Sequence, residues 1–140
     1  MKKYKTIDEV IRKGQILVNV PVMIIMVIVP IVLAIGIPMV IPEKYEGAGI
    51  LIGLFGGMGL GFLLAWTWWS FSVAKWRIWA FENTKKSDWK ALKSRAIKGK
   101  LIWEDGSKFE KTEIRNKEEQ IKIEKINSEI GELESEISLD

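Results

Sequence analysis

The chain of 140 residues contains no cysteine and no histidine. Without cysteine it has no disulfide and no thiol nucleophile, and without histidine it lacks the commonest metal ligand and the usual general base at neutral pH. Most classes of enzyme thereby lose their central residue. We expect a protein that is not an enzyme, with no catalytic, cofactor-binding or metal site.

Charge is also missing from a long stretch of the sequence. Residues 16–41 contain one polar side chain, that of Asn19, and between this run and Lys75 charged side chains occur only in a turn at residues 43–46. A helix needs ~20 apolar residues to cross the ~30 Å of a bilayer's hydrocarbon core, and a signal peptide has a much shorter apolar region. Ion-coupled carriers usually need a charged group inside the membrane, which argues against that class.

Two apolar segments predict an all-α membrane protein built on a transmembrane hairpin at residues 15–74, with spans at about 16–37 and 48–71. The turn between them, residues 42–47, permits only an antiparallel arrangement, so both termini lie on one side. Five Lys/Arg residues precede the first span and nine lie within residues 75–100. The positive-inside rule therefore predicts cytoplasmic termini, and we expect the inner membrane of a bacterium.

Small residues recur every four positions along the second span: Gly49, Gly53, Gly57, Gly61 and Ala65. Helices in lipid associate by close packing, and glycines four residues apart let two backbones touch. The row therefore predicts a helix-packing groove. It either receives the first span of the same chain or joins copies of the chain into a homo-oligomer.

The first span offers β-branched side chains that could fill this groove. They are Val18, Val22, Ile25, Val29 and Val32. Pro30, in the middle of the same span, predicts a bend because it removes a backbone donor and clashes with the preceding turn.

Aromatic and basic residues are concentrated where the second apolar segment ends. They are Trp66, Trp68, Trp69, Lys75, Trp76, Arg77 and Trp79. Indole rings settle at the depth of lipid headgroups, and lysine and arginine side chains extend toward phosphates. We therefore predict that these seven residues lie at the membrane interface.

The first 14 residues predict an amphipathic helix that lies in the membrane interface. Thr6 and Glu9 have the spacing of a capping box, in which each side chain accepts a hydrogen bond from the other residue's backbone N–H. Val10 and Ile11 fall on an apolar face. Gly14 follows as a hinge before the first span.

Residues 75–111 form a basic juxtamembrane module, because residues 75–117 have a net charge of +7. A helix is expected over residues 88–98, with Ser87 as its N-cap and Gly99 as its C-cap. One face of this helix is apolar, with Trp89, Leu92 and Ala96. A small β-hairpin is predicted at residues 101–110, around Asp105-Gly106.

Residues 112–140 predict a C-terminal cytoplasmic helix that begins at Thr112. Its apolar residues follow the spacing of a short coiled coil: Ile123, Ile126, Ile130, Leu133 and Ile137. Residues 118–140 have a net charge of −6, so like charges oppose self-pairing. The helix is expected to pack on the basic module of its own chain or to bind a different basic partner.

The overall plan resembles that of the large-conductance mechanosensitive channels: a basic amphipathic N-terminal helix, glycine-bearing spans, both ends inside and a C-terminal helical seam. The regular glycines lie in the second span here, and residues 42–47 make a far shorter turn than that family's extracellular loop. No functional residue is carried over from the family.

These features predict a small, non-enzymatic integral membrane protein that anchors or assembles a complex. Its expected partners are the lipid bilayer, including anionic lipids, and either further copies of the chain or a larger membrane complex, but not nucleic acid. Two alternatives stay open. One is an oligomeric channel or pore with its bend at Pro30, and the other is a module that senses anionic lipid.

Overall fold

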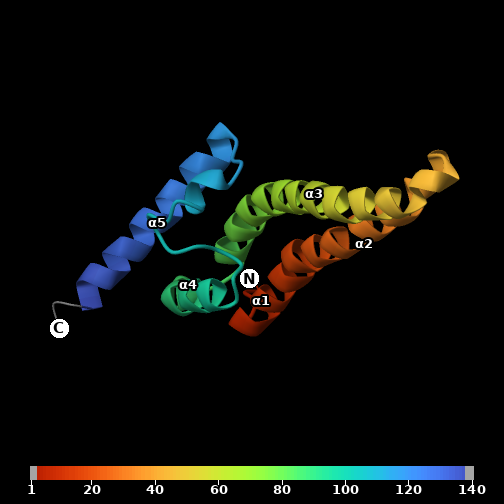
Figure 1. The fold of residues 1–140 in the computed structure, drawn as a ribbon. Coiled ribbons are helices and arrows are strands. Elements are labelled where there is room, and N and C mark those ends of the chain that lie inside the picture. Colours follow the sequence, from red (N-terminus) through yellow and green to blue (C-terminus); the bar gives the residue numbers. More distant parts are fainter. Residues whose placement is uncertain (1–2, 138–140) are drawn as a thin grey trace. The chain divides into compact units, whose positions relative to one another are not determined.

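The computed structural model describes residues 3–137, with side chains as far as residue 135, and those residues contain helices but no strand. The α-helices are α1 (Ile7–Gly14), α2 (Val20–Gly36), α3 (Glu46–Glu82), α4 (Trp89–Lys98) and α5 (Lys117–Ile137) (Figure 1). A π-helix, Gln15–Asn19, joins α1 to α2. Short 3-10 turns lie at Pro38–Val40, Glu43–Tyr45, Lys86–Asp88 and Glu110–Thr112.

The chain divides into two compact units. Residues 19–69 form one of them, which we call the hairpin unit, and residues 1–18 together with 70–140 form the other, the terminal unit. The helices Ile7–Val40 and Glu43–Glu82 are both long and apolar enough to cross a membrane. The prediction of an all-helical chain with two candidate spans is therefore confirmed.

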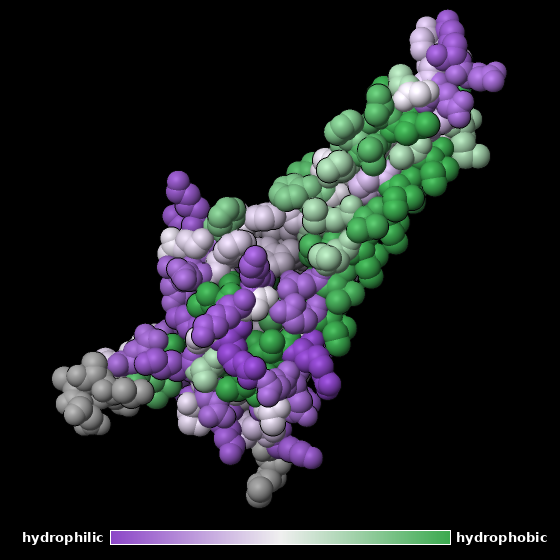
Figure 2. All heavy atoms as spheres, turned by 60° about the horizontal axis from the view of Figure 1, so that its bottom comes forward, coloured by the Kyte–Doolittle hydropathy of each residue, from purple (hydrophilic) through white to green (hydrophobic). Residues whose placement is uncertain are grey.

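The hairpin unit pairs α2 with α3 in antiparallel directions. Gly53 of α3 lies against Leu33 of α2, and Gly61, two turns further along α3, lies against Ile25, two turns earlier in α2. The outward faces carry large apolar side chains that are at least half exposed: Met23, Val27, Ile31, Ile35, Leu51, Phe55, Met58 and Leu63. Figure 2 shows hydrophobic side chains along the hairpin helices on the face in view.

The terminal unit has a core assembled from four helices. Its buried side chains include Val10 of α1, Val73, Ala74 and Ile78 of α3, Leu92 and Ala96 of α4, and Ile123, Ile126 and Ile130 of α5. The described parts of three segments that we predicted as successive modules, residues 1–14, 75–111 and 112–140, therefore contribute to one core with the last part of α3.

The capping box at the start of α1 is confirmed. Thr6 N donates to Glu9 Oε2 at 3.0 Å, and Glu9 N donates to Thr6 Oγ1 at 3.3 Å. Gly14 is not a hinge, because the helix continues through it into the π-helix. A Cβ atom at Gly14 would lie 2.5 Å from the indole ring of Trp76, so glycine is needed there for close packing.

Helix α4 is found where the sequence predicts it, with Trp89, Leu92 and Ala96 buried. Its N-cap position is Asp88, however, one residue after Ser87, and the Asp88 side chain makes no capping hydrogen bond. Gly99 is the C-cap as expected.

The predicted β-hairpin at residues 101–110 is wrong. Leu101 and Ile102 are both buried, at 0% and 2% exposure, whereas adjacent residues of a strand point to opposite faces. Gly106 does form a turn, with φ at +79°, and the rings of Trp103 and Phe109 stack with centroids 4.7 Å apart. The segment is a compact loop closed by this aromatic pair.

Helix α5 begins at Lys117 and not at Thr112, which lies in a 3-10 turn. The cap is Asn116: its N–H donates to Glu119 Oε2 at 2.9 Å, and Glu119 N donates to Asn116 Oδ1 at 2.8 Å. Thr112 has Arg115 three residues later, and a guanidinium cannot accept a hydrogen bond to complete such a box. The reciprocal hydrogen bonds between Asn116 and Glu119 therefore place the start of α5 at Lys117.

Replacing Asn116 with alanine removes this cap and should lower the free energy of unfolding by about 1 kcal/mol. Thr112→Ala is the matched control and should have less than half that effect. Thermal unfolding of the full chain in mild detergent, followed by circular dichroism, measures both. A larger loss for Thr112→Ala would show that α5 begins earlier.

Candidate functional site

The glycine row of α3 faces α2 of the same chain. A Cβ atom at Gly53 would lie 2.7 Å from the Cα atom of Ala34, and one at Gly57 would lie 2.5 Å from the Cα atom of Pro30. Backbone atoms cannot rotate away as a side chain can, so both positions require glycine. The groove is therefore filled within one chain.

The other positions of the row contribute less. A Cβ atom at Gly61 would make ordinary contact at 3.5 Å with α2, and one at Gly49 would meet the flexible end of Ile41. Ala65 is buried, at 2% exposure. A Cβ atom at Gly59, outside the row, would have no described atom within 4 Å outside its own helix.

The predicted ridge on α2 is correct in part. Val29 faces Gly61 with its side chain and Ile25 faces it with its backbone carbonyl, whereas Val32 is 57% exposed. The closest contacts with Gly57 and Gly53 come from Pro30, Leu33 and Ala34. The predicted residues follow a 3.5-residue repeat. A straight helix with 3.6 residues per turn rotates by ~20° per heptad away from that repeat, which brings different residues to the contact.

The aromatic and basic residues predicted for the membrane interface have divergent environments. Trp66, Trp68 and Trp69 belong to the hairpin unit, where Trp66 and Trp69 have ring centroids 5.7 Å apart and Trp68 is 45% exposed. In the terminal unit, Lys75 is exposed and Trp79 is half-buried beneath Lys13.

Trp76 and Arg77 are buried inside the terminal unit, so the prediction that they reach lipid headgroups is wrong. Trp76 is 4% exposed and Arg77 is 1% exposed. The indole N–H of Trp76 donates to the carbonyl of Val10 at 3.2 Å. The physical reason is that α3 continues beyond the hairpin unit, which ends at Trp69, and its last turns form part of the core of the terminal unit.

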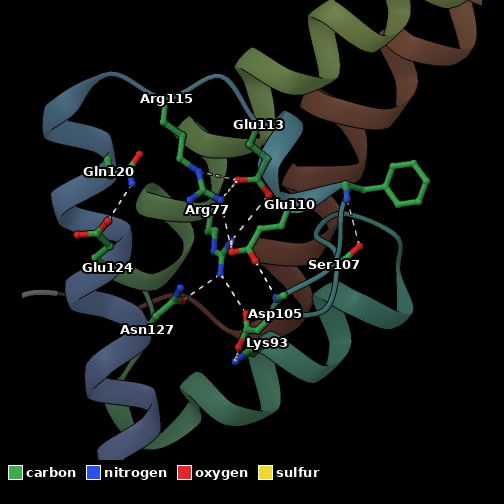
Figure 3. A network of polar contacts seen from close by, with 12 residues as sticks. Arg77, Lys93, Asp105, Ser107, Glu110, Glu113, Arg115, Gln120, Glu124 and Asn127 are labelled. Carbon is green, nitrogen blue, oxygen red and sulfur yellow. Dashed lines mark hydrogen bonds and ion pairs between the residues drawn. The ribbon is translucent and has the colours of Figure 1, made fainter.

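Arg77 is the buried centre of a cluster of charges (Figure 3). Its Nη2 atom donates to Asn127 Oδ1 of α5 at 3.0 Å. Three carboxylates surround the guanidinium, those of Asp105, Glu110 and Glu113, at 3.7–3.8 Å.

Two further cations complete the cluster. Arg115 Nη2 lies 2.6 Å from Glu113 Oε2 and 3.6 Å from Glu110 Oε1, and Lys93 of α4 pairs with Asp105. Three cations thus face three carboxylates, so the cluster is neutral overall. It ties α3, α4, α5 and the loop between α4 and α5 together, and its carboxylates are all engaged by cations.

Sequence reasoning did not identify this cluster. One signal was present: Arg77 follows Val73 by four residues and precedes Phe81 by four, so it lies on an apolar helical face. A charge on such a face is buried only with partners. The acidic residues near position 110 were the candidates for that role.

The apolar seam of α5 packs within the terminal unit. Ile123, Ile126 and Ile130 are buried, and Ile123 clusters with Ala74 and Ile78 of α3. Leu133 is half-buried, and the side chain of Ile137 lies outside the described residues. Lys86 also pairs with Glu129 and thereby holds the pKa of that carboxyl below its usual range.

No protein-family model, curated protein or solved structure matches this chain.

Gly57→Ala should destabilise the hairpin by about 1–3 kcal/mol, because the new methyl group overpacks against the backbone of Pro30. Gly59→Ala is the matched control and should leave stability unchanged or slightly raised. Unfolding of the full chain by dodecyl sulfate in mixed micelles measures the difference. Equal effects of the two substitutions would contradict the packing described here.

Arg77→Leu should destabilise the terminal unit by about 3 kcal/mol, because three carboxylates then face two cations and the buried Glu113 keeps Arg115 as its one partner. Adding Glu113→Gln should recover part of that loss. The surface pair Arg95–Asp8 provides a control, because Arg95→Gln should cost less than about 1 kcal/mol. Chemical unfolding of the four proteins tests this, and no recovery in the double variant would contradict the pairing.

Proposed function

We propose that this protein is a small, non-enzymatic membrane anchor. In this proposal the hairpin unit crosses the bilayer twice and holds the terminal unit at the cytoplasmic surface, at the inner membrane of a bacterium. The terminal unit then positions a partner or a larger complex.

The observation that carries the proposal is the exposure of the apolar helices. In the most apolar 18-residue stretch of each candidate span, 6% of the first and 28% of the second is buried. A core helix of a soluble protein would be mostly buried. Large apolar side chains left on the outside of a helical hairpin instead suit the hydrocarbon of a bilayer, where the helix satisfies its own backbone groups.

The distribution of charge supports the proposed orientation. The turn between α2 and α3 holds Glu43, Lys44 and Glu46, whereas five cations precede the first span and nine lie within residues 75–100. Cytoplasmic flanks of membrane helices are enriched in Lys and Arg. Both ends of the hairpin would then lie in the cytoplasm.

For assembly, the outward face of α5 is the surface that we favour. Glu118, Glu124, Glu132 and Glu134 are exposed on it together with Ile121, which is 65% exposed. The neighbours of Ile121 on the helix are two glutamates, Glu118 and Glu124, and two lysines, Lys117 and Lys125, whereas the exposed charged side chains further along are acidic. This surface suits a partner with a matching apolar residue and with basic groups toward the C-terminal part of α5. An oligomeric pore has less support, because α2 of the same chain fills the glycine row through which copies would associate.

Cysteine labelling tests the proposed topology directly, because the natural chain has no thiol. In intact bacterial cells, a membrane-impermeant maleimide should label Lys44→Cys, in the turn. It should label Lys122→Cys, exposed on α5, only after the cells are permeabilised. The unmodified chain is the control, and labelling of both variants in intact cells would contradict the proposal.

A further inference from the structure

A surface hollow of about 310 Å³ lies between α1, the following π-helix and α3 in the terminal unit. It is lined by Lys5, Glu9, Arg12, Lys13, Ile16, Leu17 and Trp79. The lining combines basic, aromatic and apolar side chains.

The basic side of this hollow is held in place by its neighbours. The backbone N–H of Lys5 donates to the carbonyl of Asn83 at 2.8 Å, which fixes residue 5 at the end of α3. The ammonium group of Lys13 lies 3.8 Å from the ring centroid of Trp79. The indole therefore positions one of the three cations.

The hollow keeps a net positive charge. Glu9 is its one carboxylate, and hydrogen bonds with Thr6 hold the pKa of Glu9 below its usual range, so it is ionised at neutral pH. Three cations against one carboxylate leave a charge of +2. The charges of Lys5 and Arg12 also stabilise the ionised Glu9, and the excess of two cations over this carboxylate is what an anionic ligand would meet.

The other side of the hollow is apolar, and it indicates how deep the hollow lies in a membrane. Ile16 is 56% exposed and Leu17 is 48% exposed, and they are the first residues of the long apolar run. Arg12 and Lys13 lie within four residues of the start of this run in the sequence. In a chain whose hairpin spans the bilayer, Arg12 and Lys13 therefore lie at headgroup depth, and Ile16 lies where the acyl chains begin.

We infer that this hollow binds the headgroup phosphate of an anionic phospholipid. Lys5, Arg12 and Lys13 face the phosphate, and the acyl chains lie along Ile16 and Leu17. The inference rests on the proposed insertion of the hairpin and adds to it a defined lipid site.

A second basic hollow in the terminal unit lacks this combination. It is lined by Lys90, Lys93, Ser94, Ile97, Lys98, Glu104 and Glu134. Two carboxylates offset its lysines, and Lys93 is also paired with Asp105. Its one apolar residue, Ile97, is only half-exposed and is not next to an apolar run. This hollow serves as the matched control.

The test is a lipid titration of the full chain in mild detergent, followed by native mass spectrometry. Phosphatidylglycerol and phosphatidylcholine with identical acyl chains are the two probes. The natural chain should bind phosphatidylglycerol more tightly. Arg12→Gln with Lys13→Gln should weaken that binding about tenfold or more and leave phosphatidylcholine binding unchanged. The reason is that each cation near an anionic headgroup strengthens the binding of that lipid.

Lys90→Gln with Lys98→Gln should change phosphatidylglycerol binding less than about twofold, since these cations lie at the other hollow. If the Arg12 and Lys13 double variant does not fold, Lys5→Gln alone should weaken binding about fivefold. An equal loss in the control variant would overturn the inference, because it would show a general effect of surface charge.

Two more outcomes would overturn the inference. One is equal affinity of the natural chain for both lipids, and the other is complete displacement of phosphatidylglycerol by excess inorganic phosphate, which would indicate a site for a free anion. Either result in a chain that passes the Lys44→Cys labelling test would leave the proposed membrane anchor standing. Failure of that labelling test would instead reject the anchor itself.

Discussion

Direct contact between the backbones of α2 and α3 at Gly53 and Gly57 is the interaction on which the hairpin unit depends. Because the small residues face inward, large apolar side chains such as Val27 and Phe55 are left on the outside. Close packing at the centre and hydrocarbon-like side chains around it suit a lipid environment, in which helices gain little from burying apolar surface. The same contact occupies the glycine row within one chain.

The terminal unit is held together in a different way. The last turns of α3 supply its apolar core, and Arg77 of the same helix gathers carboxylates from a loop that forms no strand. A buried guanidinium is costly unless it is paired, so the neutral cluster makes the position of that loop specific. Residues from both ends of the sequence are thereby joined into one body, which suits a module that presents surfaces to lipid and to a partner.

Sequence periodicity predicted the helices well because it depends on local spacing, and the capping box of Thr6 with Glu9 is found as expected. The caps predicted at Ser87 and Thr112 lie instead at Asp88 and Asn116. Features that depend on distant residues were predicted poorly. The burial of Trp76 and Arg77 follows from packing against segments far away in sequence, which local spacing does not reveal. Predicting the contact of Pro30 with Gly57 would require the actual rotation of α2 about its axis, which departs from that of an idealised 3.5-residue repeat.

The central claim is that the hairpin unit lies in hydrocarbon, and the depth of spin labels at its middle tests this most directly. Val27 is 57% exposed on α2 and Phe55 is 67% exposed on α3, so a cysteine at either site carries a label without disturbing the helix contact. In reconstituted bilayers, power saturation should show both labels accessible to oxygen and shielded from a water-soluble nickel chelate. Free access of the chelate to either label would contradict the account.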